Sequence, residues 1–325
     1  MPSPQLGAPF TVLQADSRFC HHESASQTLG GGTRLNYWWE SARANALWAA
    51  RHSYQHLLYC LAEPCQHEIA GRLFTAWCKL RALSDAVASR DGAESANSLL
   101  LYLDSDAFWH PSTMRVETVL RKFVPTSDWA ARGADSVSMF FGCNLPWKSE
   151  DRGRRVWNAS LINADRGPPN DGVMLLRATA STRALLRAWW AMAAKSPRWN
   201  HKFAWEQSAL WELWSQQPAW ARRMRVLYDE KRDECMRTMD PAHPSPIVHV
   251  AGGMLPPARR EARLDSLGLR HNGSRAWSTC LTRLAAVQGD GGAATARPRR
   301  CPAQRLHVTA AGAVHLGRCE PCRPL

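Results

Sequence analysis

The sequence predicts an α/β fold in which a mostly parallel central sheet is flanked by helices. One observation is that short apolar runs typical of strands alternate with longer segments whose apolar residues recur every three or four positions. A second is the run LLLYL at 99–103, which is too short for a helix and apolar throughout, as expected of a strand buried on both faces. With 325 residues, 45% of them hydrophobic, the chain is long enough for one large core.

The first half of the chain opens with FTVLQ at 10–14, a short apolar run that predicts a strand. Two helices are expected next, at 41–61 and 67–89, because apolar residues in each fall on one stripe at helical spacing. The strand at 99–103 follows them. Ser112 is a suitable N-cap for a helix that reaches Phe123.

The second half continues the alternation. SVSMFF (136–141) and GVMLLR (172–177) predict strands, helices are expected at 180–195 and 205–217, and RVLY (225–228) and PIVHV (246–250) predict two further strands. The Gly, Ala, Pro and Arg content of 283–300 predicts a flexible linker. We therefore expect one domain at 10–282 and a Cys-containing basic tail at 301–325.

The charge distribution and the hydropathy of the chain bear on two classes of partner, nucleic acids and membranes. The net charge is +13, but residues 255–325 alone hold 12 Arg against four acidic residues, and no nucleic-acid-binding motif occurs, so we expect a solvated basic tail and no nucleic-acid partner. No apolar stretch is long enough for a membrane span. Residues 1–18 lack the order of a signal peptide, so no targeting segment is expected within this chain. The oligomeric state is left open.

The ten cysteines leave two readings open. Cys319 and Cys322, with Cys301, His307 and His315 upstream, supply half of the ligand pairs that a structural zinc site normally shows. Disulfides formed in an oxidising compartment explain cysteines of this number equally well.

Asp104 and Asp106 are the first candidates for chemistry, because they directly follow the buried strand at 99–103. Ligands of open α/β sheets bind beyond the carboxyl ends of strands, and residues two apart in an extended segment point to one side. Hard carboxylate oxygens suit Mn²⁺ or Mg²⁺, which commonly also bind phosphate oxygens. Hydrolases with an aspartyl nucleophile use a similar pair, but they require Thr or Val where this chain has Phe108.

Three later segments carry further polar candidates. Asn170 and Asp171 lie in PPNDGVMLLR, just before a predicted strand, and AWEQSALWELW places Glu206 and Gln207 at a helix start. IVHVAGG ends a strand with His249, and its Gly252 lets backbone amides approach a phosphate. Trp109 and Trp147 lie near strand ends, where an aromatic ring either packs in the core or stacks on a sugar.

The series Leu-Asp-Ser-Asp-Ala, Asn-Asp-Gly, Glu-Gln-x-Ala-Leu and His-x-Ala-Gly, in this order, resembles glycosyltransferase family 34, which includes galactosyl-, xylosyl- and mannosyltransferases. NALWAARHSYQHLLY (45–59) and WCKLRAL (77–83) also resemble family segments, so the likeness spans about residues 10–255. The chain departs from the pattern at Val250, normally aromatic, and at Gly253, normally Cys. These departures leave the sugar open.

The resemblance implies a Rossmann-like nucleotide-diphospho-sugar transferase domain of the GT-A type. It implies Mn²⁺, with Mg²⁺ as the alternative, bound by Asp104, Asp106 and His249. It also implies a retaining enzyme that moves galactose or xylose from a UDP-sugar to a glycan acceptor in the Golgi lumen. A mannosyltransferase using GDP-mannose, or a binding protein of this fold without catalysis, is the alternative.

The same resemblance suggests roles for the remaining candidates. Glu206 is expected to stabilise positive charge on the donor sugar, with Asp171, Asn170 and Gln207 holding that sugar. Ser105 faces away from the two carboxylates, toward the ribose. Lys79, and also Arg51 and His52, are candidates for the diphosphate, together with the backbone at Gly252, although a solvated helix face explains Lys79 equally well.

Overall fold

The computed structural model describes the central part of the chain with gaps, together with two short C-terminal segments. The described residues are 10–20, 26–29, 32–35, 37–61, 63–90, 98–109, 114–124, 137–143, 169–202, 204–229, 234–236, 246–249, 303–308 and 314–316.

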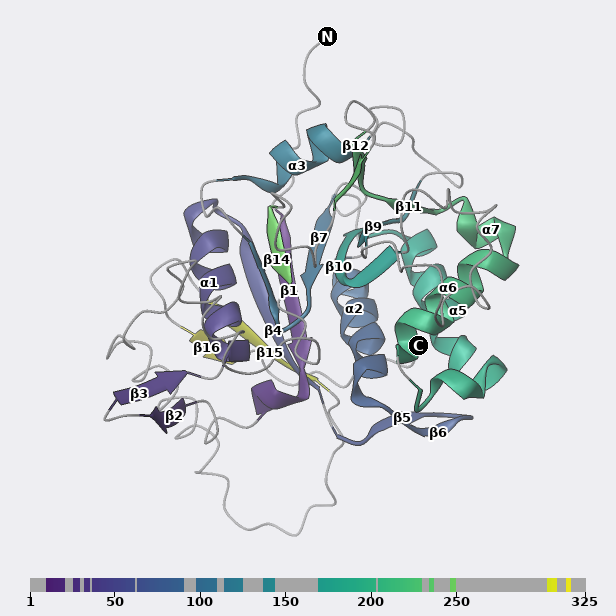
Figure 1. Ribbon diagram of the computed structural model, residues 1–325, viewed down its shortest axis with the longest axis horizontal. Helices are drawn as coiled ribbons and strands as arrows, with labels where there is room; N and C mark the ends of the chain where they lie inside the picture. Colours follow the sequence, from purple (N-terminus) through teal and green to yellow (C-terminus); the bar gives the residue numbers. More distant parts are fainter. Residues whose placement is uncertain are drawn as a thin grey trace.

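An eight-stranded sheet forms the centre of the fold (Figure 1). Its order is β11 (Met224–Val226), β9 (Met139–Cys143), β10 (Pro169–Arg177), β7 (Leu99–Leu103), β1 (Thr11–Asp16), β4 (Gln55–Leu61), β15 (Ala303–Val308) and β16 (Val314–Leu316). Strand β1 pairs in parallel with β4 and β7, and β11 with β9, whereas β10 and β15 pair antiparallel with both of their neighbours. All strands except β10 and β15 therefore run in one direction, which confirms the predicted α/β fold with a mostly parallel sheet.

Both faces of this sheet are covered. Helices α2 (Lys79–Ala88), α5 (Ala180–Lys195) and α6 (Trp205–Gln216) pack on one face, where Leu100 and Tyr102 of β7 join their core. Helices α1 (Tyr37–Arg51) and α3 (Val116–Phe123) and strand β8 (Ala107–Trp109) contribute to the core on the other face. Figure 1 shows α1 on one side of the sheet and α2, α5 and α6 on the other. Two covered faces explain why β7 is apolar at every position.

The smaller elements lie outside the central sheet. They are the two-stranded pairs β2 (Ser26–Leu29) with β3 (Gly32–Leu35), β5 (Cys65–His67) with β6 (Gly71–Leu73), β12 (Tyr228–Asp229) with β13 (Glu234–Cys235), and β8 with β14 (Ile247–His249). Short helical segments η1 (Ser17–Cys20), η3 (Thr75–Cys78), η6 (Pro197–Trp199) and α7 (Pro218–Ala221) complete the described elements.

Two predicted helices are wrong in part. The segment 41–61 is helical only to Arg51, because the chain turns at Ser53, which has a φ of 60°, and residues 55–61 pair with β1 as strand β4. In the segment 67–89, a hairpin of β5 and β6 precedes α2, which begins only at Lys79. The other predicted helices and strands overlap described elements, although the N-cap of α3 is Arg115, and Ser112 lies outside the described residues. Helix α5 matches its predicted bounds.

The structure answers two questions that the sequence left open, how part of the tail is placed and how four of the cysteines pair. The backbone of 303–308 pairs with β4, so part of the tail at 301–325 extends the central sheet, while the predicted linker at 283–300 lies outside the described residues. Disulfides join Cys65 to Cys78 and Cys143 to Cys235, as the oxidising reading expects. The tail pair Cys319 and Cys322 lies outside the described residues. Among the helices that the structure describes, none has the length and apolarity needed to cross a bilayer.

Candidate functional site

Asp104 and Asp106 lie in a tight turn at the carboxyl end of β7. The backbone N–H of Asp104 donates to Gly172 O at 2.8 Å, and the N–H of Ala107 donates back to Asp104 O at 2.9 Å. The chain then reverses into β8. The turn keeps both carboxylates partly exposed, at 28% and 14% of their side-chain surface, while the strand before it is buried.

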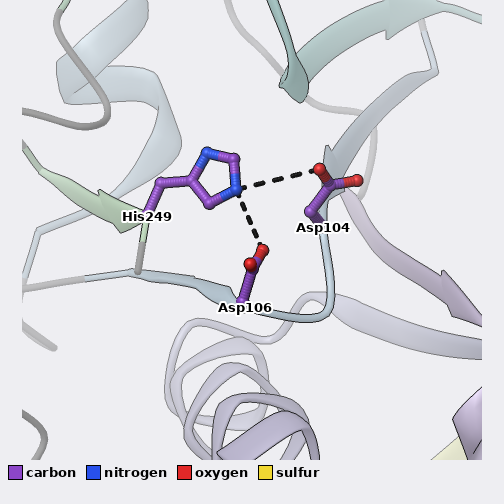
Figure 2. A group of neighbouring side chains, drawn as sticks. All are labelled: Asp104, Asp106 and His249. Carbon is purple, nitrogen blue, oxygen red and sulfur yellow. Dashed lines mark hydrogen bonds and ion pairs between the residues drawn. The ribbon is translucent and has the colours of Figure 1, made fainter. Parts of the chain in front are cut away.

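His249 joins these carboxylates through the pairing of β14 with β8, in which His249 stands opposite Ala107. Its Nε2 lies 2.9 Å from Asp106 Oδ1 and 3.8 Å from Asp104 Oδ2. Figure 2 marks both contacts with dashed lines. One potential ligand atom from each residue lies within 4.8 Å of the others. Burial disfavours the charged imidazole, but Asp106 and Asp104 outweigh it and raise the pKa of His249.

The three side chains form a donor set that fits a divalent metal. Two carboxylates and an imidazole suit a divalent metal ion in both charge and chemistry. Two of the proposed ligands pack closely against the backbone at Gly172, because a Cβ there would lie 2.4 Å from His249 Cε1 and 2.6 Å from Asp104 Oδ2. A side chain at position 172 would therefore displace the proposed ligands, which explains the glycine in the Asn-Asp-Gly segment.

Lys79 lies beside this group and is buried, not part of a solvated helix face. Its Nζ is 2.8 Å from Glu206 Oε1, 3.1 Å from Asp171 Oδ2 and 3.6 Å from Asp104 Oδ1. Burial lowers the pKa of Lys79, but the three carboxylates outweigh it and raise the pKa well above its ordinary value. One ammonium therefore faces three carboxylates.

The excess of negative charge also acts on the neighbouring acids. Burial raises the pKa of Asp171 well above its ordinary value, and Glu206 and Asp104 add to this effect against the opposing charge of Lys79. The Tyr102 hydroxyl donates to Asp104 Oδ1 at 2.8 Å. Glu206 Oε2 is buried and has no hydrogen-bond partner among the described residues. This cluster can accept a further cation or hydrogen-bond donor at modest cost, because its own positive charge is insufficient.

Gln207 and Asn170 hold the backbone between these acids. Gln207 Oε1 accepts a hydrogen bond from the N–H of Asp171 at 3.1 Å, and Asn170 Oδ1 accepts one from the N–H of Gly172 at 2.9 Å. The candidates of the Asn-Asp-Gly segment, on β10, and those of the Glu-Gln segment, on α6, are therefore brought together by the fold. Their hydrogen bonds fix the strand bulge that begins at Asn170.

Ser105 points away from the metal group, toward the end of β1. Its hydroxyl donates to Asp16 and accepts from Arg18, whose guanidinium also pairs with Asp16 at 2.6 Å. The Arg18 guanidinium lies over the rings of Tyr37 and Trp38. Sequence reasoning missed Asp16 and Arg18. The available signal was their position after the strand predicted at 10–14, at the same edge of the sheet as Asp104.

The other predicted residues do not join the group. Arg51 ends α1, and His52 follows it three positions before β4. The first residue of β4 pairs with the start of β1, so both residues lie at the opposite edge of the sheet from Asp104. Gly252 and Trp147 lie outside the described residues. Trp109 is buried and stacks on Trp48 with ring centroids 4.3 Å apart, so it packs in the core and leaves no face for a sugar.

A different aromatic pair includes Trp205, the residue before Glu206 in the sequence. Phe74 stacks on Trp205 with ring centroids 3.8 Å apart and an interplanar angle of 9°. Phe74 is 42% exposed, although large apolar side chains are usually buried. Trp205 directly precedes Glu206 and has a left-handed φ of 45°, a strained conformation that often marks functional sites.

Comparisons with known proteins give little further information. No protein-family model matches the chain, and no curated protein matches it either. Among solved structures, the fold is similar to that of a glycosyltransferase involved in the glycosylation of the major capsid of PBCV-1. The two chains share 16% identity over 79% of this chain and 99% of the other, with a TM-score of 0.46. The resemblance to family 34 stays a prediction.

Proposed function

We propose that this chain is a metal-dependent retaining glycosyltransferase of the GT-A type that takes a nucleotide diphosphate sugar as donor and a glycan as acceptor. The observation that carries the proposal is the grouping of Asp104, Asp106 and His249 at the carboxyl edge of the sheet, next to the buried acids Asp171 and Glu206. Such an edge is where ligands of open α/β sheets bind.

Mn²⁺ is the proposed metal, with Mg²⁺ as the alternative. Asp104, Asp106 and His249 would hold it, and the grouping of one ligand atom from each within 4.8 Å supports this assignment. When bound, the ion would supply positive charge that stabilises the diphosphate as a leaving group. Without it, the two carboxylates would repel a diphosphate from this edge.

The donor nucleotide is proposed to lie between the ends of β1 and β7. Ser105, Asp16 and Arg18 offer a hydroxyl, a carboxylate and a guanidinium within one hydrogen-bonded group, which suits a ribose and its base. We propose a UDP-sugar, with galactose or xylose as the sugar, and GDP-mannose as the alternative. Lys79 is proposed to act near the diphosphate indirectly, by holding the carboxylates of Asp104, Asp171 and Glu206 in place.

The transfer breaks the bond between the anomeric carbon and the diphosphate oxygen, and the electron pair leaves with the diphosphate. The acceptor hydroxyl forms the new bond on the same face, and its proton passes to the leaving diphosphate, so no separate general base is needed. Positive charge develops at the sugar in between. We propose that the Glu206 carboxylate stabilises this charge and that Asp171, Asn170 and Gln207 fix the donor sugar.

The acceptor is proposed to stack on the exposed ring of Phe74. Sugar rings pack their C–H faces on aromatic side chains, and this ring lies on Trp205, the neighbour of Glu206. An acceptor held there would reach the sugar from the side of α6. The proposed acceptor site and the proposed catalytic carboxylate of Glu206 would then both involve residues of α6.

A donor panel tests the proposal. Purified protein is incubated with Mn²⁺ and UDP-galactose, UDP-xylose, UDP-glucose or GDP-mannose, and the released nucleotide is measured with and without EDTA. We expect metal-dependent turnover of a UDP-sugar and its loss in Asp106→Asn. Turnover of GDP-mannose alone would replace the donor but keep the reaction class. Folded protein that turns over no donor would refute catalysis and leave a binding protein of this fold.

A further inference from the structure

The turn that carries Asp104 and Asp106 is held by buried side chains of other elements. Asn45 of α1 is fully buried, and both ends of its amide bind the backbone of β8. Its Nδ2 donates to Ala107 O at 2.9 Å, and its Oδ1 accepts from the N–H of Trp109 at 3.0 Å. The side chain thus spans the strand that directly follows Asp106.

Two further polar side chains complete this support. Ser41, one helical turn before Asn45, donates from its hydroxyl to Ala107 O at 2.8 Å. Gln14 of β1 donates from Nε2 to Ser41 Oγ at 3.2 Å and to Asp104 O at 3.1 Å. The backbone is therefore bound on both sides of Asp106, at Asp104 and at Ala107.

The Asn45 amide contributes to stability, because an apolar residue at this position would leave the buried N–H of Trp109 without this partner. The same buried face of α1 otherwise carries Ala42, Ala46 and Ala49. The amide also restricts the position of the β8 backbone, because a hydrogen bond fixes the atoms that it joins more narrowly than apolar packing does.

The held backbone also sets the position of the third proposed ligand. His249 stands opposite Ala107 in the β8–β14 pair, and Ile247 stands opposite Trp109. Asn45 binds the backbone of both of these β8 residues. A shift of β8 would therefore move Asp106 and His249 together relative to Asp104.

From these contacts we infer that Asn45 is a positioning residue for the metal site: it holds the backbone that aligns Asp104, Asp106 and His249. Asn45 itself offers no atom to a metal or a substrate, because both of its amide atoms are engaged with the backbone. The inference rests on the proposed function only in requiring that these three residues bind a divalent metal.

The test is Mn²⁺ affinity of the full chain, measured by electron paramagnetic resonance of the free ion. Residues that orient metal ligands typically change affinity about 10- to 100-fold when replaced, and we expect a loss in this range for Asn45→Ala. Asn200→Ala is the matched control, since Asn200 is also buried and binds a backbone carbonyl, Ala193 O at 3.1 Å, away from the metal group. It should bind Mn²⁺ as the wild type does.

A second readout separates positioning from general loss of stability. Saturating Mn²⁺ should restore the donor turnover of Asn45→Ala, because the metal itself realigns its ligands, so the activation constant rises while kcat is kept. If Asn45→Ala does not fold, Ser41→Ala removes one of the two bonds to Ala107 O and should weaken Mn²⁺ binding several-fold.

The outcomes are distinguishable. Wild-type affinity in folded Asn45→Ala, or in Ser41→Ala where the first variant does not fold, would overturn the inference. An equal loss in Asn200→Ala would do so as well. A wild-type protein that binds no Mn²⁺ would instead refute the proposed metal site, and the inference with it.

Discussion

Replacing Lys79 by Met tests the charge balance of the acidic cluster. Met keeps the length of the side chain and removes its charge. The side chains of Asp171 and Glu206 are each 5% exposed, so neither carboxylate regains water when the ammonium at 3.1 Å and 2.8 Å is lost. Removing one partner of a buried ion pair typically costs about 3–5 kcal/mol, and we expect a loss of this size in the free energy of unfolding at pH 7.

Urea denaturation of the metal-free protein measures this loss. The deficit should shrink as the pH falls toward 4. Burial raises the pKa of Asp171 above that of an unfolded chain, and loss of the ammonium raises it further, so the folded state takes up a proton first. Adding Glu206→Gln to the variant should recover part of the deficit.

The exposed Lys195 provides the control for this experiment, because Lys195→Met should change stability by less than about 1 kcal/mol. A Lys79→Met deficit below about 1 kcal/mol, or one that does not depend on pH, would refute the reasoning.

Three further predictions follow from the site and the core. Glu206→Gln keeps the shape of the side chain and removes its charge, so kcat should fall at least about 100-fold while donor affinity, measured by calorimetry, changes little. Phe74→Ala should raise the acceptor KM about tenfold and leave donor hydrolysis without acceptor unchanged; equal losses in both assays would exclude acceptor stacking. Burial lowers the pKa of His56 to about 3, against 6.5 in an unfolded chain. As the pH falls below about 6.5, this group should therefore reduce the free energy of unfolding by about 1.4 kcal/mol per pH unit, and His56→Gln should flatten this dependence in urea titrations.

The sequence predicted secondary structure correctly where a single local pattern was strong. The run at 99–103 has no charged residue and is too short for a helix, so it predicted a strand covered on both faces. That strand places the two acids after it at the sheet edge. Helix α5 was predicted at its observed bounds, and in the structure the Thr179 side chain caps its first turn by accepting from the N–H of Thr182.

Where local signals compete, tertiary pairing decides. The residues of β4 continue the apolar stripe of α1, and only the pairing of 55–61 with β1 makes them a strand. Likewise, the burial of Lys79 was not predictable, because the acids that compensate it come from β10, α6 and the end of β7. Asp16 and Arg18 were missed because their partner Ser105 is 87 or more positions away in the sequence.

The central claim is that Asp104, Asp106 and His249 bind the metal that carries the donor diphosphate. Crystals grown with Mn²⁺ and UDP, measured at the manganese absorption edge, test it most directly. We expect an anomalous peak between these three side chains, with the diphosphate of UDP bound to the ion. Manganese bound elsewhere, or UDP bound away from Asp106 in the presence of Mn²⁺, would contradict it.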